Sequence, residues 1–134
     1  TRSPLVLRDV DILRSGSQFE VGMSITTADE RIRYLFEPSA PPIPERLRAL
    51  GELHQSGIRT FAMLAPLLPG SEDLPDLLAG KVDSVILDRM NYHHADWVYR
   101  KYGLEDKNTA GYFDMVTQSL QLAFQRLGIS IASG

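Results

Sequence analysis

The octapeptide MSITTADE at residues 23–30 gives the clearest indication of how this chain folds. Apolar residues alternate with small or polar ones from Val21 onward, which predicts a strand over Glu20–Ile25 with one buried side. Thr27 and Glu30 then fit a capping box, so we expect a helix that starts at Thr27. A strand that carries hydroxyl groups to its carboxyl end and turns at once into a helix is a common way for α/β proteins to build a ligand site.

Strand and helix patterns alternate along the rest of the chain. Further strands are expected at 58–65 and 82–87, and residues 129–131 have the composition of another strand's start. Short helices are expected after Ser3 and after a cap at Ser71. A longer helix is expected after the proline-rich connector 39–44; it buries Leu47, Leu50 and Leu53 and stops at Gly57. The last helix stops at Gly128 and is expected to bury Tyr112, Phe113, Val116, Leu120, Ala123, Phe124 and Leu127. This alternation predicts an α/β fold, with parallel strands joined by crossover helices.

The composition excludes several classes of protein. The 134 residues suffice for one domain with a core, and the apolar share of 43% and charged share of 23% are those of an ordinary globular protein. A net charge of −3 argues against strong nonspecific attraction to nucleic acid. No apolar run approaches the roughly 20 residues needed to span a membrane, and no signal peptide is recognisable, so we expect a cytoplasmic protein. The chain has no cysteine, which excludes disulfides and thiolate metal sites.

The richest polar cluster is the segment DRMNYHHADW at 88–97, which follows an expected strand. One interpretation gives Asp88, Arg89 and Asn91 contacts with a substrate or cofactor and makes Tyr92 and Trp97 stacking surfaces. The other interpretation, which we favour for the aromatic residues, packs Trp97, Tyr99 and Tyr102 in a loop under the last helix and leaves Arg100 and Lys101 in solvent. The sequence pattern alone leaves both interpretations of Asp88 and Arg89 open.

Other charged residues indicate no further chemistry. His93, His94 and Asp96 are assigned no metal site, because adjacent histidines rarely ligate one ion and no third ligand has a recognised spacing. Charged residues of the expected helices, among them Arg33 and Arg46, are assigned to exposed faces, where single ion pairs contribute little. No Ser-His-Asp order, phosphate loop or paired-carboxylate site is apparent.

Three runs of this chain resemble one known family. They are SPLVLRD at 3–9, SITT at 24–27 and PLLPG at 66–70, and their order and spacing are similar to those of radical S-adenosylmethionine (SAM) proteins of the spore-photoproduct-lyase-like group, often labelled DNA repair photolyase. The resemblance implies a partial (β/α) TIM-like barrel, of which residues 1–134 form the carboxyl-terminal part. Three or four strands make an arc, so the missing amino-terminal half of the barrel is the implied partner. The open sheet edge predicts self-association of the isolated chain.

The resemblance also implies a reaction. Such enzymes use a [4Fe-4S] cluster, held by three cysteines, to donate one electron to SAM, which yields methionine and a 5′-deoxyadenosyl radical that abstracts a hydrogen atom from the substrate. Relatives suggest a thymine-dimer-type DNA lesion, so the implied parent is a DNA-lesion lyase. This chain has no cysteine to bind the cluster, and we expect the chain alone to be inactive.

In addition to Asp88 and Arg89, which are candidates from the polar cluster, the resemblance assigns cofactor contacts to residues at the strand ends. Ser24, with Thr26 at the rim, takes the polar position that hydrogen-bonds the ribose or methionine part of SAM; alternatively, both hydroxyls only satisfy nearby backbone groups. Arg2 takes the place of a lysine near the cofactor's carboxylate. Leu68 and Gly70 belong to a variant of the family's adenine-binding loop; alternatively, this is an ordinary strand-to-helix turn.

Two other classes of function stay open. One is a complete small α/β module whose rim, residues 24–27 with 66–70, binds a nucleotide or phosphate. The other is an interaction domain that completes its sheet with another chain or a second copy. Titration with S-adenosylhomocysteine separates the first class from the enzyme, and light scattering against concentration tests the second.

Overall fold

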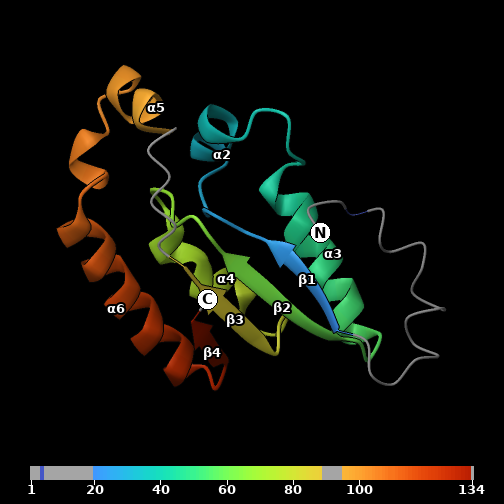
Figure 1. Ribbon diagram of the computed structural model, residues 1–134. Coiled ribbons are helices and arrows are strands. Elements are labelled where there is room, and N and C mark those ends of the chain that lie inside the picture. Colours follow the sequence, from blue (N-terminus) through green and yellow to red (C-terminus); the bar gives the residue numbers. More distant parts are fainter. Residues whose placement is uncertain (1–3, 5–19, 89–94, 134) are drawn as a thin grey trace.

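The computed structural model describes Pro4 and residues 20–88 and 95–133 (Figure 1). Within these residues four strands form one parallel sheet in the order β1-β2-β3-β4. The strands are β1 (Glu20–Ser24), β2 (Arg59–Leu64), β3 (Ser84–Leu87) and β4 (Ser130–Ser133). The helices are α2 (Glu30–Phe36), α3 (Ile43–Gln55), α4 (Leu74–Leu78), α5 (Asp96–Lys101) and α6 (Ala110–Arg126), with 3₁₀ turns η2 (Ser71–Asp73) and η4 (Glu105–Lys107). The predicted α/β fold, with parallel strands and helices between them, is confirmed.

One face of the sheet carries the main hydrophobic core. Alternate strand residues such as Met23, Ala62 and Val85 are at most 1% exposed and belong to this core. Apolar residues of three helices belong to the same core: Ile43, Leu47 and Leu50 of α3, Leu74 and Leu78 of α4, and Phe113, Val116, Leu120 and Phe124 of α6. Because successive strand residues point to opposite faces, α3, α4 and α6 all pack on the same face of the sheet.

The opposite face of the sheet bears small and partly exposed side chains. In the β1–β2 register, Gly22 lies beside Phe61 and Ser24 lies beside Met63. The Phe61 ring covers Gly22, since a Cβ at that glycine would lie 2.1 Å from the Cζ atom of Phe61. Met63 is 39% exposed. Within the described residues, the core helices therefore leave this second face uncovered.

Helix α3 forms as its sequence predicts. Pro44 lies in the first turn, where the N–H that proline lacks has no partner within the helix. Leu47, Leu50 and Leu53 are buried on one face. Gly57 ends the helix with a φ of +85°, a conformation that favours glycine. The proline-rich connector and the stop at Gly57 are therefore both confirmed.

The start of α2 differs from the prediction, and the capping box is wrong. Asp29 is the N-cap, and its carboxylate accepts a hydrogen bond from the N–H of Arg31 at 2.9 Å. The hydroxyl of Thr27 instead donates to the carbonyl oxygen of Pro69 at 2.6 Å. Asp29 caps the helix because it immediately precedes Glu30, the first helical residue. Thr27 lies two residues too early for a cap, and its hydroxyl bonds the backbone of the loop after β2 instead.

Other predictions for the second half of the chain are partly wrong. Ser71 is no cap: its hydroxyl is buried and, within the described residues, has no hydrogen-bond partner. The stretch 88–109 contains α5 and η4, which are too short to give a clear periodic pattern. Leu127 is 42% exposed, because α6 ends one residue before it. The stop at Gly128, with φ +72°, and the strand that follows it are confirmed.

The described sheet is open, with β1 and β4 at its edges. The helix expected after Ser3 lies outside the described residues. None of the helices in the described ranges is long and apolar enough to cross a lipid bilayer. All four strands run in the same direction, and Figure 1 shows α2 and α5 at the end toward which the strands point. This carboxyl edge is where parallel sheets usually bind ligands.

Candidate functional site

Two loops meet at the carboxyl edge, where β1 and β2 end. The N–H of Leu68 donates to the carbonyl oxygen of Thr26 at 3.1 Å, and the N–H of Ala28 donates to the carbonyl oxygen of Gly70 at 3.2 Å. The two motifs that the sequence indicated, SITT and PLLPG, therefore lie side by side. Adjacent parallel strands produce this proximity, because their carboxyl ends share one edge.

Thr27 fixes the two loops to each other. It is completely buried, and its hydroxyl donates to the carbonyl oxygen of Pro69 and accepts the N–H of Asp29 at 3.0 Å. Gly70 has a φ of +90°, and a Cβ at this position would lie 2.7 Å from the Thr27 hydroxyl oxygen. Gly70 therefore approaches Thr27 closely, whereas the adenine contact that the resemblance implies for this loop stays a prediction.

A pocket of about 540 Å³ lies at this edge. Its lining comes from the end of α2 and the connector after it, from the loop after β2, and from the start of α5: Leu35, Phe36, Glu37, Pro38, Ser39, Ala40, Pro41, Pro66, Leu68, Ala95, Trp97 and Val98. Pockets of about 300–1,000 Å³ with mostly apolar walls are typical of small-molecule sites. Of the predicted site residues, Leu68 lines the pocket, whereas Ser24, Thr26 and Gly70 are not among the lining residues.

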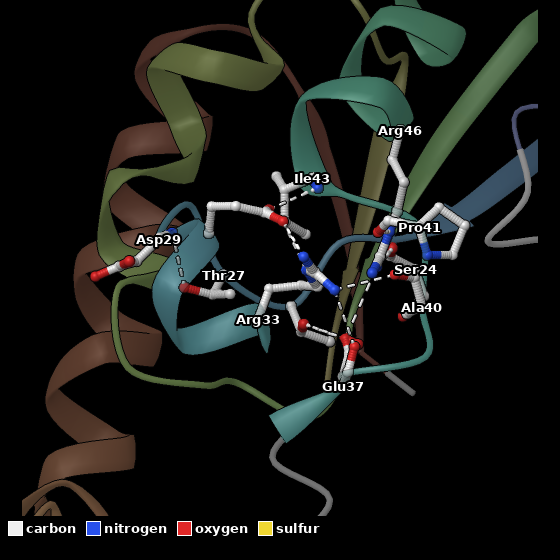
Figure 2. A network of polar contacts seen from close by, with 11 residues as sticks. Ser24, Thr27, Asp29, Arg33, Glu37, Ala40, Pro41, Ile43 and Arg46 are labelled. Atoms are coloured by element: carbon white, nitrogen blue, oxygen red, sulfur yellow. Dashed lines mark hydrogen bonds and ion pairs between the residues drawn. The ribbon is translucent and has the colours of Figure 1, made fainter. Parts of the chain in front are cut away.

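Thr26 is linked to the pocket through Glu37. The Thr26 side chain is completely buried, and its hydroxyl donates to the two carboxylate oxygens of Glu37 at 2.9 and 3.4 Å. The Glu37 side chain is only 10% exposed and also lies 3.8 Å from the guanidinium of Arg46 (Figure 2). The strand-end hydroxyl thus orients the acidic group of the pocket, a contact that the sequence did not predict.

Arg46 joins the connector to the end of β1. It is completely buried, and its guanidinium donates to the carbonyl oxygen of Ser24 at 2.9 Å and to that of Pro41 at 2.8 Å. Its assignment to an exposed face is wrong. One signal could have corrected that assignment: Arg46 falls at the spacing that places Ile43 and Leu50 on the buried side of α3.

Arg33, also predicted to be exposed, is 8% exposed and holds the same connector (Figure 2). Its guanidinium donates to the carbonyl oxygens of Glu37 and Ala40 at 3.3 and 3.1 Å and pairs with Glu30. Burial alone would raise the pKa of Glu30. Hydrogen bonds from Arg33 and the Ile43 N–H, together with the charge of Arg33, lower the pKa by more than burial raises it, so it falls below its ordinary value. Glu30 therefore stays ionised and ties α2 to α3.

Ser24 ends β1 on the face away from the core helices. Its hydroxyl oxygen is buried and has no hydrogen-bond partner within the part of the chain that the structure describes. A buried hydroxyl without a partner is costly in a folded protein. The predicted alternative, in which the Ser24 hydroxyl satisfies a neighbouring backbone group, is therefore wrong for this residue.

The aromatic residues of the last loop separate into two groups. Tyr99 is 4% exposed and packs edge-on against Phe36, with ring centroids 4.8 Å apart. Burial, together with Tyr112 and Asp96, raises the pKa of the Tyr99 phenol to about 12. Trp97, in contrast, is 56% exposed and lines the pocket. The predicted burial is confirmed for Tyr99, whose ring partner Phe36 belongs to α2, and it is wrong for Trp97 and for Tyr102, which is 43% exposed.

The remaining predicted residues contribute less to the geometry. Outside the described residues lie Arg2, Arg89, Asn91, Tyr92, His93 and His94. Asp88 follows β3, and its N–H donates to the carbonyl oxygen of Leu64 at 3.4 Å. Within the ranges 20–88 and 95–133, no group of three histidine or acidic side chains is placed to hold a metal ion.

Two uncharacterized proteins are among those similar to this chain. One, from Methanocaldococcus jannaschii, is 35% identical over 74 residues, which are 55% of this chain and 29% of the relative. The other, from Acidianus two-tailed virus, is 33% identical over 78 residues, which are 58% of this chain and 26% of the relative. The chain thus spans less than a third of the length of these curated relatives. No family model and no solved structure matches it.

Proposed function

We propose that this chain is the carboxyl-terminal, SAM-binding part of a radical SAM enzyme of the spore-photoproduct-lyase-like group. The observation that carries the proposal is the pocket at the carboxyl edge of a parallel sheet, which is lined by Pro66 and Leu68 of the PLLPG loop and linked to Thr26 of the SITT loop through Glu37. The two relatives are each more than three times as long as the segment that matches, which accords with a longer parent protein.

The topology supports the partial-barrel part of this proposal. Strands follow one another in sequence order, and the core helices share one face of the sheet. A doubly wound sheet would reverse its strand order and carry helices on both faces. A (β/α) barrel instead keeps its helices outside and turns the other face of the sheet inward. The face that carries Gly22, Ser24 and Met63 corresponds to that interior.

The chemistry of the described residues fits SAM better than a phosphate ligand. SAM carries a flat purine, which suits the mostly apolar walls of the pocket, and the one acidic residue among the described lining residues, Glu37, is already paired with the buried Arg46. The buried Ser24 hydroxyl, which has no partner within the described residues, supplies a donor and acceptor at the end of β1. In the proposed enzyme Leu68 contacts the adenine, while Ser24 and Thr26 orient the ribose or methionine part.

The [4Fe-4S] cluster does not fit the residues of this chain. The chain has no cysteine, so none of its side chains can supply a thiolate to bind the iron atoms. We therefore place the cluster ligands, as a Cys-x-x-x-Cys-x-x-Cys run, in another part of the parent protein. SAM, when bound, supplies the deoxyadenosyl group of the reaction, and this chain's residues bind it, orient it and exclude water. With a net charge of −3, this chain is poorly suited to hold the implied DNA substrate, whose contacts we also place elsewhere.

Ligand titrations test this function, and Trp97 is a convenient reporter because it is the chain's single tryptophan and lines the pocket. We expect SAM and S-adenosylhomocysteine to change its fluorescence saturably, and ATP and inorganic phosphate to have no effect. Ser24→Ala should weaken SAM binding about fivefold through the lost hydrogen bond, whereas Ser130→Ala, at an exposed position of β4, should leave it unchanged. Preferential binding of phosphate, or no binding of SAM, would overturn the proposal.

A further inference from the structure

The exposed faces of the two longest described helices, α3 and α6, differ in charge. Three of the five exposed residues of α3 are charged: Pro44, Glu45, Arg48, Glu52 and Gln55. In α6 only two of ten are charged: Ala110, Gly111, Asp114, Met115, Gln118, Ser119, Gln121, Leu122, Gln125 and Arg126. Charged and polar side chains normally cover the outer face of a helix, and the centre of a protein–protein interface is depleted of charge. The exposed face of α6 therefore has the composition of an interface.

Two large apolar side chains lie on this face. Met115 is 59% exposed and Leu122 is 56% exposed. They are seven residues apart, about two helical turns, so they lie on one stripe, and Gln118 lies between them. At about 100° per residue, this stripe is on the side of α6 opposite the buried residues Phe113, Val116, Leu120 and Phe124. A seven-residue apolar spacing allows one helix to pack along another.

The groups on the stripe can pair with their own copies. Met115 and Leu122 can pack on the same residues of a second α6. The Gln118 amide carries both donors and an acceptor, so two copies of it can hydrogen-bond to each other. A carboxylate would instead meet a like charge across a two-fold axis. Because the chain has a net charge of −3, this uncharged stripe is a place where two copies can meet without repulsion.

The charges at the two ends of α6 favour an antiparallel pair of helices. Asp114 lies in the first half of α6, and Arg126 is its last residue. In an antiparallel pair, the acidic end of one helix lies beside the basic end of the other, and the two helix dipoles oppose each other. Met115 of each copy then lies near Leu122 of the other, with Ser119 close to the two-fold axis.

We propose that the stripe of Met115, Gln118 and Leu122 on α6 joins two copies of this chain in an antiparallel, two-fold symmetric dimer. This inference goes beyond the proposed function and does not depend on SAM. None of the described lining residues of the pocket belongs to α6, and Figure 1 shows α6 on the opposite side of the molecule from α3. The dimer differs from association through the open sheet edge, which would use β1 or β4.

Sedimentation of the 134-residue chain over a range of concentrations tests the dimer. We expect a reversible monomer–dimer equilibrium. Leu122→Lys should weaken dimerisation about a hundredfold, because each dimer loses two buried leucines and gains two like charges. Leu77→Lys is the matched control, since Leu77 is 38% exposed on α4, and it should dimerise like the wild type. A monomeric wild type, a dimer that survives Leu122→Lys, or equal losses in both variants would overturn the inference.

Cross-linking gives a second test that does not depend on how Leu122→Lys folds. Because the chain has no cysteine, an introduced thiol is its only one. Ser119→Cys should form a covalent dimer under mild oxidation, whereas Gln55→Cys, at an exposed position of α3, should stay monomeric. Equal yields of covalent dimer would contradict the inference.

SAM titration separates this inference from the proposed function. Leu122→Lys should bind SAM as tightly as the wild type, because Leu122 does not line the pocket. A dimer that binds no SAM would refute the proposed function alone. A wild-type chain that binds SAM and stays monomeric would refute the dimer alone.

Discussion

Completely buried threonines lie at both ends of the sheet, and two of them, Thr60 and Thr26, are used differently. At the amino end, the Thr60 hydroxyl donates to the backbone carbonyl of Lys81 at 2.7 Å, and its backbone N–H and C=O pair with Asp83. At the carboxyl end, the Thr26 hydroxyl donates to the carboxylate of Glu37, which lines the pocket. The Thr60 hydroxyl joins the start of β2 to the loop before β3, and the Thr26 hydroxyl orients the carboxylate of a residue that lines the pocket.

The comparison shows why buried polar residues need separate interpretations at the two ends. A hydroxyl bonded to a backbone carbonyl satisfies the fold and exposes nothing to solvent. A hydroxyl bonded to a side chain in a cavity can instead set that side chain's position. In a parallel sheet the second use is expected at the carboxyl edge, where ligands bind.

The largest expected effect is the loss of Arg46 at the carboxyl end. Arg46→Ala removes a completely buried guanidinium and leaves the carbonyls of Ser24 and Pro41 without their donor, so we expect about 3–5 kcal/mol of destabilisation by urea unfolding. Arg48→Ala is the matched control on the same helix, because its ion pair with Glu52 is exposed, and it should change stability by less than about 0.5 kcal/mol. Similar losses in both variants would show that the network does not stabilise this edge.

The next effect concerns the loops at the carboxyl edge. Gly70→Ala combines a φ of +90° with a Cβ 2.7 Å from the Thr27 hydroxyl, and should destabilise the protein by about 2–3 kcal/mol. Gly57→Ala has nearly the same φ and nothing within 4 Å, so only the backbone cost of about 1 kcal/mol is expected. Thermal unfolding of both variants measures the difference. Equal losses would mean that the close approach to Thr27 contributes nothing.

The two threonines themselves give a smaller and more diagnostic effect. Thr60→Val and Thr26→Val should each lower the free energy of unfolding by about 1–2 kcal/mol, because each removes a buried hydrogen bond. Under the proposed function, Thr26→Val also weakens SAM binding, since Glu37 loses its donor, and Thr60→Val leaves binding unchanged. If the two variants affect binding equally, the distinction between the two ends of the sheet is wrong.

The smallest effect is a pH dependence at Glu30. Its pKa is lower in the folded protein than its ordinary value of 4.5, so the unfolded chain takes up this proton first as the pH falls. The stability that ionised Glu30 contributes is therefore complete above about pH 4.5 and is lost as the pH falls through the folded-state pKa. Urea unfolding of the wild type and Glu30→Gln should show a difference at pH 7 that vanishes in acid. A difference that grows in acid would contradict this sign.

The sequence contained enough information for the order of the elements. Alternation at Val21, Met23 and Ile25, the leucines of α3 and the stop at Gly57 are local patterns, and the structure confirms the elements that they predict. Parallel strands also implied that the SITT and PLLPG loops would meet, as they do. Hydrophobic periodicity and turn-forming residues depend on neighbouring positions in the sequence, so they predict strands, helices and turns without knowledge of the tertiary contacts.

The candidate site was less predictable because its contacts join residues far apart in the chain. Thr26 and Glu37 are eleven residues apart, and Arg46 reaches Ser24 across twenty-two. No local pattern reports such pairs, and charged helix residues usually face solvent. The capping-box prediction failed for a related reason. Thr27 matches the motif, but its hydroxyl donates to the carbonyl oxygen of Pro69, which is 42 residues away in the sequence.

Chemical-shift mapping with SAM tests the central claim most directly, because it reports on both ends of the sheet in one experiment. We expect shifts of the backbone amides of Glu37, Leu68 and Trp97 at the carboxyl edge, with the amides of Thr60 and Asp83 unchanged. Shifts concentrated at Thr60 and Asp83, or no saturable shift at either end, would contradict it.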